Sequence, residues 1–110
     1  MKGKNFAMPM YKATNEENHD KLLKILEKHV PTLREFELID DSPAFLLQSD
    51  DGTIIETFEW KNEETKQAAH EHPAIRTLWG EMEGICDFPS LSDLPESNNR
   101  FPNFKVLKKY

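Results

Sequence analysis

Apolar side chains recur along the chain at two spacings, which together predict a mixed α and β structure. Between residues 15 and 33 they recur at helical spacing, as Leu22, Leu23, Ile25, Leu26, Val30 and Leu33. We expect a first helix from about Asn15 to Val30, opened by Thr14 and Glu17 in the spacing of a capping box. Pro31 disfavours the α conformation at the residue before it, so a kinked or restarted last turn is expected.

Other stretches have the composition of β-strands. Ala44–Gln48 and Thr53–Trp60 flank a turn that contains Asp51-Gly52, which predicts an antiparallel hairpin. Phe6–Tyr11 is expected to be the first strand. Pro9 would remove one ladder donor from it, so this strand should lie at an edge or carry a bulge. The last strand is expected at Asn103–Lys109.

Two further helical pieces are expected between these strands. The first follows Asn62, a suitable N-cap, and covers Glu63 to about His70. His72 precedes a proline and should be extended, whereas Pro73 suits the first position of a new helix. Apolar residues then predict a helix with one buried stripe over 73–86, formed by Ile75, Leu78, Trp79, Met82, Ile85 and Cys86.

The resulting order, β-α-β-β-α-β, predicts a single α+β domain over residues 1–110. It matches the ferredoxin-like arrangement, with one antiparallel sheet and both helices on one face. Alternation in the third strand puts apolar residues on both of its faces: one side carries Ile54, Glu56, Phe58 and Trp60, and the other Thr53, Ile55, Thr57 and Glu59. A sheet apolar on both faces predicts a second sheet against it, supplied by a second copy in a homodimer. The long connection 88–102 is expected to cover something or to reach a partner.

Composition and charge indicate which classes of partner the protein can bind and in which cellular compartment it is expected. The net charge of −6 argues against nucleic acid, which requires a basic face. The lysines at 105, 108 and 109 are better explained as a solvated edge strand. Cys86 is the only cysteine, so no intrachain disulfide is possible, and its apolar neighbours indicate a core residue. No signal-peptide or transmembrane run is found, so a soluble, cytoplasmic protein is expected.

Several motifs resemble those of small bacterial proteins related to the antibiotic-biosynthesis monooxygenases. These motifs are Phe58-Glu59-Trp60, Ala69-His70-Glu71-His72-Pro73, Leu78-Trp79, Cys86 and Phe101-Pro102-x-Phe104. The resemblance covers about residues 22–104. It implies a dimeric α+β barrel, with a pocket between sheet and helices in each subunit, and places the chain in an uncharacterised subgroup. Characterised relatives include enzymes that oxidise aromatic polyketides without a cofactor.

Four side chains are candidates for acid–base catalysis: Glu56, Glu59, His70 and His72. Glu56 lies between apolar residues of its strand, so it is either a desolvated base or a paired, structural glutamate. Glu59 is on the opposite face, and only one of the two can look into a given cavity. One of the two imidazoles would bond backbone groups freed at the helix break, or act as an acid, a base or a substrate contact. Alternatively, His70 and His72 together would bind a metal, with a third ligand such as Glu59.

Large side chains nearby are expected to line a pocket: Phe58, Trp60, Trp79 and Met82, although ordinary core packing also explains Trp79 and Met82. The resemblance then implies a cofactor-independent monooxygenase, or a related oxidoreductase, for a small aromatic or polyketide-like substrate. A base would remove a phenolic or α-carbonyl proton, and oxygen would attack the carbanion. The alternative is a non-catalytic dimeric protein that binds a small apolar ligand or has a structural role. No cofactor and no metal are expected.

Overall fold

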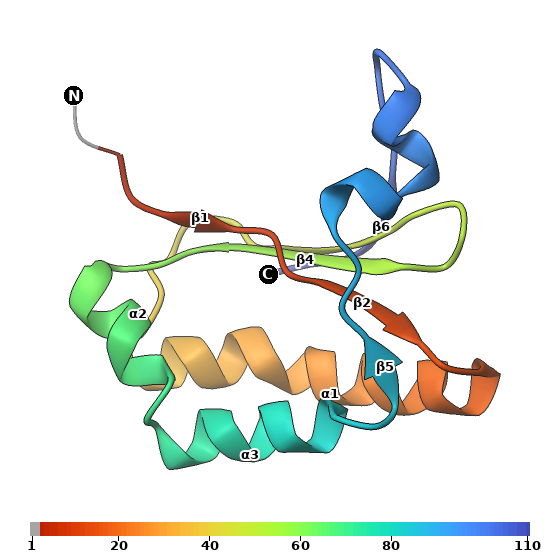
Figure 1. Ribbon diagram of the computed structural model, residues 1–110. Helices are drawn as coiled ribbons and strands as arrows, with labels where there is room; N and C mark the ends of the chain where they lie inside the picture. The colour runs from red at the N-terminus through yellow and green to blue at the C-terminus, as the bar shows by residue number, and fades with distance from the viewer. Residues whose placement is uncertain (1–2) are drawn as a thin grey trace.

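Helices cover one face of an antiparallel sheet in the computed structural model, which describes residues 3–110 (Figure 1). Along the chain the elements are β1 (Phe6–Ala7), β2 (Met10–Ala13), α1 (Glu16–Glu35), β3 (Phe45–Gln48), β4 (Ile54–Glu59), α2 (Glu63–Ala69), α3 (Pro73–Met82), β5 (Cys86–Asp87), η1 (Leu91–Asp93), η2 (Pro95–Asn98) and β6 (Lys105–Lys109). The predicted α+β class with an antiparallel sheet is therefore confirmed.

The strand β4 lies at the centre of the sheet, whose order is β5-β2-β4-β3-β6, with β1 also paired to β4. Ile55 is paired with Met10 on one side and with Leu47 on the other. The predicted hairpin is confirmed as β3 and β4. Its turn places Gly52 at a φ of 88°, a left-handed conformation that glycine adopts without a steric penalty.

Pro9 interrupts the first predicted strand and divides it into β1 and β2. The register is unchanged across the interruption, since Ala7 faces Phe58 and Met10 faces Ile55. The prediction of an edge strand is confirmed for β1, which among the described residues pairs with β4 alone, and is wrong for β2, whose Lys12 and Ala13 also pair with β5. The carbonyl of Pro9 accepts a hydrogen bond from the backbone of Glu56 at 3.0 Å, and the proline, which has no N–H, donates none in return.

The helix α1 continues through Pro31 to Glu35, so the predicted end at Val30 is wrong. A proline within a helix leaves the carbonyl four residues earlier without its usual donor. That carbonyl belongs to Glu27, and the hydroxyl of Tyr110 donates to it at 3.4 Å. At the other end Asn15, and not Thr14, caps the helix by accepting from the backbone of Asn18 at 2.8 Å.

The helix that begins at Pro73 is shorter than predicted. It ends at Met82 because Glu83 is extended and Gly84 has a φ of 84°. Cys86, predicted to be helical, instead pairs with Ala13 as part of β5. The predicted last strand exists as β6, but it pairs with β3 at the opposite edge of the sheet. The order β5-β2-β4-β3 is compatible with a ferredoxin-like arrangement, to which β6 is added.

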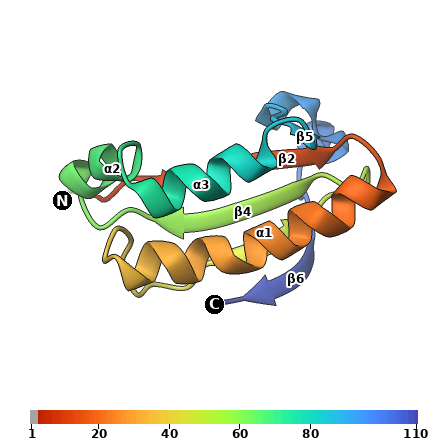
Figure 2. The same ribbon diagram turned by 90° about the horizontal axis from the view of Figure 1, so that it is seen from below.

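The two faces of β4 meet different surroundings, as alternation predicts. Ile54 and Phe58 face the helices and belong to core clusters that include Leu26 and Leu33 of α1. Figure 2 shows α1 and α3 side by side across this face of the sheet. On the other face Ile55 packs with Met10 and with Leu94, a residue between η1 and η2. The site described below lies on the helical side.

A short segment covers part of the face away from the helices; we call residues 91–98, which contain η1 and η2, the strap. Glu96 fastens it to the β3–β4 turn, because the buried carboxylate accepts from the Ser49 hydroxyl at 2.6 Å and from the Asp50 backbone at 2.8 Å. The strap lies within the connection that was expected to cover something. Large apolar side chains remain exposed outside it: Phe6, Met8, Phe88, Phe101 and Val106.

Two expectations from composition are met in the described residues. Cys86 is buried, and its thiol donates to the carbonyl of Met82 at 3.4 Å. The pKa of this thiol is raised, mainly because the group is buried and to a smaller extent because Asp87 lies nearby. All five residues of β6 are exposed at the sheet edge, including Lys105, Lys108 and Lys109. Within residues 3–110, no helix combines the length and the apolar character that crossing a membrane requires.

Candidate functional site

A chain of hydrogen bonds joins four side chains from four elements on the helical side of the sheet. Tyr11 on β2 donates its hydroxyl to Oε1 of Glu56 on β4, at 3.0 Å. The same oxygen lies 2.8 Å from Nδ1 of His29 on α1. Nε2 of His29 accepts from the indole Nε1 of Trp79 on α3, at 3.0 Å. We call these four residues the buried network.

Regular structure places each member of this network. Glu56 follows Ile54 and precedes Phe58 on the helix-facing side of β4, where it lies opposite Leu46 of β3. His29 lies on the buried stripe of α1, which is formed by Leu22, Leu26, His29, Val30 and Leu33. The network therefore replaces part of an otherwise apolar contact between helix and sheet. Glu56 is fully buried, and His29 is 2% exposed.

The partners of His29 assign its tautomer. An indole nitrogen can only donate, so Nε2 of His29 must accept from Trp79. The proton of the neutral ring is then on Nδ1, which donates to Glu56. This is the orientation that a carboxylate gives to a histidine acting as a general base, with the second nitrogen turned towards the site.

Glu56 uses one carboxyl oxygen for both of its hydrogen bonds. Oε1 accepts from Tyr11 and His29, whereas Oε2 has no hydrogen-bond partner among residues 3–110. The pKa of Tyr11 is raised well above its ordinary value of 10.0. Burial of the phenol is the largest cause, and the negative charge of Glu56 and the hydrogen bond to it are the next two. The phenol of Tyr11 therefore stays protonated at neutral pH and serves as a donor to the carboxylate.

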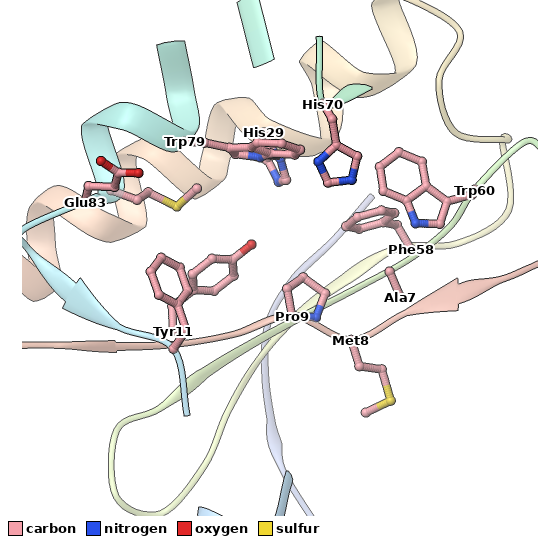
Figure 3. Close-up of a pocket in the computed structure, with 12 residues that line it drawn as sticks. Ala7, Met8, Pro9, Tyr11, His29, Phe58, Trp60, His70, Trp79 and Glu83 are labelled. Atoms are coloured by element: carbon pink, nitrogen blue, oxygen red, sulfur yellow. Dashed lines mark hydrogen bonds between the residues drawn. The ribbon is translucent and has the colours of Figure 1, made fainter. Parts of the chain in front are cut away.

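A cavity of about 490 Å³ opens beside this network (Figure 3). In Figure 3 His29, Trp79 and His70 lie along one side, and Tyr11, Pro9 and Ala7 lie on the other. Aromatic rings form most of the wall, which consists of Ala7, Met8, Pro9, Tyr11, His29, Phe58, Trp60, His70, Trp79, Met82, Glu83 and Phe88. A space of this size and lining suits a small, flat, apolar molecule that carries few polar groups.

The structure brings five of the eight predicted site residues to this cavity: Phe58, Trp60, His70, Trp79 and Met82. Trp60 packs edge-to-face on Phe58, with 5.1 Å between ring centroids, and His70 packs in the same manner on Trp79 at 5.3 Å. Phe58 and Met82 are buried, and Trp79 is half-buried. Each of them also contributes to the core between the sheet and the helices.

The other three predicted residues do not line the cavity. Glu56 lies behind it and reaches it only through His29 and Tyr11. Glu59 is on the opposite face of β4, where it accepts from the hydroxyl of Ser42 at 3.1 Å.

The third of these residues, His72, acts as the N-cap of α3. Its Nδ1 accepts from the backbone of Ala74 at 3.2 Å, and its ring packs on Phe36, with 4.1 Å between ring centroids. This is the structural role at the helix break that was weighed for one of the two histidines.

A shared metal site at His70 and His72 is not supported by their positions. His70 faces the cavity and Trp79, whereas Nδ1 of His72 is bonded to the backbone of α3. In the part of the chain that the structure describes, no three histidine, cysteine or acidic side chains gather closely enough to hold an ion.

Sequence reasoning missed His29 and Tyr11, the two polar groups of the network that reach the cavity. Both carried a signal. His29 follows Leu22 and Leu26 at helical spacing and precedes Leu33, so it falls on the buried stripe of its helix. Tyr11 ends the first predicted strand, and a tyrosine hydroxyl that becomes buried usually finds a hydrogen-bond partner. Phe88 and Glu83 were also missed, because both belong to irregular backbone after α3.

Comparisons with known proteins add no relative. No family model matches the chain, and neither the curated proteins nor the solved structures contain a significant match. The resemblance to the antibiotic-biosynthesis monooxygenases therefore stays a prediction.

Proposed function

We propose that this protein binds a small aromatic or polyketide-like molecule in the cavity and removes a proton from it, as cofactor-independent monooxygenases do. One observation carries the proposal: the cavity wall contains a histidine whose far nitrogen is bonded to a buried carboxylate. His29 and Glu56 supply a base and the group that orients it, 2.8 Å apart, in a wall that is otherwise largely apolar.

His29 is the proposed base, in place of the four residues that the sequence suggested. A proton taken by Nε2 would make an imidazolium, and the adjacent carboxylate of Glu56 would stabilise it. The buried rings of Phe58 and Trp60 would limit the access of water to this part of the cavity and so protect a carbanion from being protonated again. Molecular oxygen would then add to the carbanion to give a peroxide. Protonation of the peroxide and loss of water would leave one oxygen atom on the substrate as a carbonyl, and no cofactor takes part.

Oxygen uptake tests this function. Purified protein is incubated with a panel of bicyclic and tricyclic phenols, and oxygen consumption is followed with an electrode. Replacing His29 with glutamine should lower the rate by roughly 10²-fold or more, the usual size of a general-base contribution. His19→Gln is the matched control on the same helix, and it should leave the rate unchanged. Absence of uptake in the wild type, or full activity in His29→Gln, would contradict the proposal.

A second candidate function is binding without catalysis, and one observation favours it. Nε2 of His29 is already occupied by the indole of Trp79, so both ring nitrogens are satisfied in the absence of a ligand. A purely structural histidine would have this environment. Binding of a phenol to the cavity without any oxygen uptake would support this function over the first.

We also propose that β5, β2, β4 and β3 form a ferredoxin-like sheet whose face away from the helices pairs with a second copy. The exposed apolar side chains outside the strap support this, among them Phe6, Phe101 and Val106. Sedimentation velocity should show a dimer at micromolar concentration, and Val106→Lys should shift it towards monomer. A wild-type monomer over the same concentrations would exclude the pairing.

A further inference from the structure

The indole of Trp79 covers the nitrogen of His29 that faces the site. Its Nε1 lies 3.0 Å from Nε2 of His29, which is the only acceptor on the neutral ring. The same indole contacts His70 edge-to-face on its other side. Any ligand that uses His29 must therefore first displace the N–H of Trp79, a step that follows from the geometry alone.

Trp79 also separates two hollows of the surface. On one side is the cavity of about 490 Å³, and on the other is a cleft of about 530 Å³. The cavity and the cleft share His70, Trp79 and Glu83 in their walls. The cleft is also lined by Arg76 and Gly80. A Cβ placed at Gly80 would meet no atom within 4 Å beyond its chain neighbours and its own helix, so the cleft is open beside this residue. The half-buried indole lies between the cavity and this cleft, since it lines both.

We propose that Trp79 masks His29, so that only a ligand with a hydroxyl, which can replace the indole N–H as donor to Nε2, reaches this nitrogen. This inference rests on the proposed function, because it concerns the ligand of the same cavity. A phenol or enol restores a donor to Nε2 when the indole leaves. A ring without a donor leaves the indole in place, because displacing it would leave a buried nitrogen unsatisfied, and such a ring binds in the cavity without contacting Nε2 of His29. The substrate class is therefore a planar phenol or enol, as opposed to any flat apolar molecule.

Two matched probes test the selection. 1-Naphthol and 1-methoxynaphthalene share a ring system, but only the first can donate a hydrogen bond. Their affinities are measured by calorimetry for the wild type, Trp79→Phe and Trp60→Phe. Removing the competing N–H in Trp79→Phe should tighten 1-naphthol by roughly 3–10-fold, the worth of about one hydrogen bond, and leave the methoxy compound within about twofold. Trp60→Phe should change both affinities by the same factor.

A second measurement needs neither ligand nor activity. Long-range ¹H–¹⁵N correlation spectra of the free protein should show His29 with its proton on Nδ1 and with Nε2 unprotonated. The Nε2 signal should move in Trp79→Phe and stay in place in Trp60→Phe. A proton on Nε2 in the wild type would overturn the masking, since that nitrogen could not accept from Trp79.

The outcomes distinguish a failure of the role proposed for Trp79 from a failure of ligand binding in the cavity. If 1-naphthol binds the wild type but both probes respond in parallel to Trp79→Phe, the selection is wrong and the cavity still binds ligands. If neither probe binds any variant, both the selection and the proposed binding function fail, whereas the hydrogen bond between Trp79 and His29 is judged by the spectrum alone.

Discussion

Nδ1 of His29 and Oε1 of Glu56 lie 2.8 Å apart in the interior, and this contact joins the long helix α1 to the central strand β4. Both side chains are almost completely buried. A buried polar pair of this kind is costly to break, because the group that remains has lost its access to water. The pair is therefore a structural joint whatever its chemical role, and stability measurements can examine it separately from activity.

Replacing Glu56 should show how much the pair of His29 and Glu56 contributes to the free energy of unfolding. Glu56→Leu leaves the hydroxyl of Tyr11 and Nδ1–H of His29 without an acceptor, so we expect a loss of about 2–4 kcal/mol in the free energy of unfolding. Glu56→Gln keeps an acceptor oxygen and should lose about 1 kcal/mol. Urea denaturation measures both. The matched control, Glu59→Leu, should cost less than about 1 kcal/mol, because Glu59 is only half-buried. Equal losses at the two positions would show that the buried hydrogen bonds of Glu56 do not stabilise the fold more than the contacts of Glu59.

Sequence patterns predicted the framework that carries this pair, since those elements depend on local signals. The Asp51-Gly52 turn, the N-cap at Asn62 and the helix start at Pro73 all occur as expected. Alternation along β4 also placed Glu56 and Glu59 on opposite faces correctly. Each of these features is decided by residues within a few positions of one another.

The features that sequence reasoning missed depend on partners far away in the chain. Cys86–Asp87 is too short to show a strand pattern, and only its pairing with Lys12–Ala13 makes it one. The role of His29 required knowledge that Glu56 and Trp79 would meet it from two other elements. A kinked or restarted turn was expected after Pro31, whereas α1 runs to Glu35 as one helix, and Tyr110, far away in the chain, supplies the missing donor.

The stability of the protein in alkali should report on Tyr11. Its folded pKa is raised above the ordinary value of 10.0, so the unfolded chain gives up this proton first as the pH rises. Stability from this group is fully present below about pH 10 and is lost above it, by at most about 1.4 kcal/mol per pH unit. Tyr11→Phe should cost about 1 kcal/mol at neutral pH and flatten the alkaline decline. The pH dependence of the urea midpoint measures this.

The remaining alkaline decline in Tyr11→Phe has an expected source. Burial, followed by Glu56 and Glu27, raises the pKa of Tyr110 to about 12, so its contribution persists in the variant. If the variant declined as steeply as the wild type above about pH 10, the buried phenol of Tyr11 would not be the titrating group.

Acid should loosen the strap through Glu96. The Ser49 hydroxyl and the Asp50 backbone, which donate to this carboxylate, hold its pKa below the ordinary value of 4.5. A lowered pKa stabilises the fold above the unfolded value, and this contribution is lost as the pH falls through the folded pKa. Protection of the amides in residues 91–98 from hydrogen exchange, relative to their intrinsic exchange rates, should therefore fall below about pH 4.5, more than in α1. In Glu96→Gln this protection should already be low at neutral pH and change little on acidification. Unchanged protection in that variant would contradict the role of Glu96.

Pro31 and Tyr110 should be energetically coupled. Pro31→Ala restores a backbone donor for the carbonyl of Glu27, and we expect it to stabilise the protein by about 1–3 kcal/mol. Tyr110→Phe should cost about 1 kcal/mol in the wild type but distinctly less in Pro31→Ala, where that carbonyl has a donor again. A double-mutant cycle from urea denaturation gives the coupling. Strict additivity would mean that the hydroxyl does not compensate for the proline.

The contacts of Tyr110 have a consequence for the rate of folding. Its backbone exchanges hydrogen bonds with Ala44, its carbonyl accepts from Arg34, and its hydroxyl reaches Glu27, 83 positions earlier in the chain. Contacts of such separation require large loops to close before they contribute any stabilisation. The carbonyl of Glu27 in α1 thus has no donor from the protein until β6 has docked beside β3. We expect docking of β6 to be a late event, so that substitutions at Tyr110 chiefly accelerate unfolding and hardly slow folding.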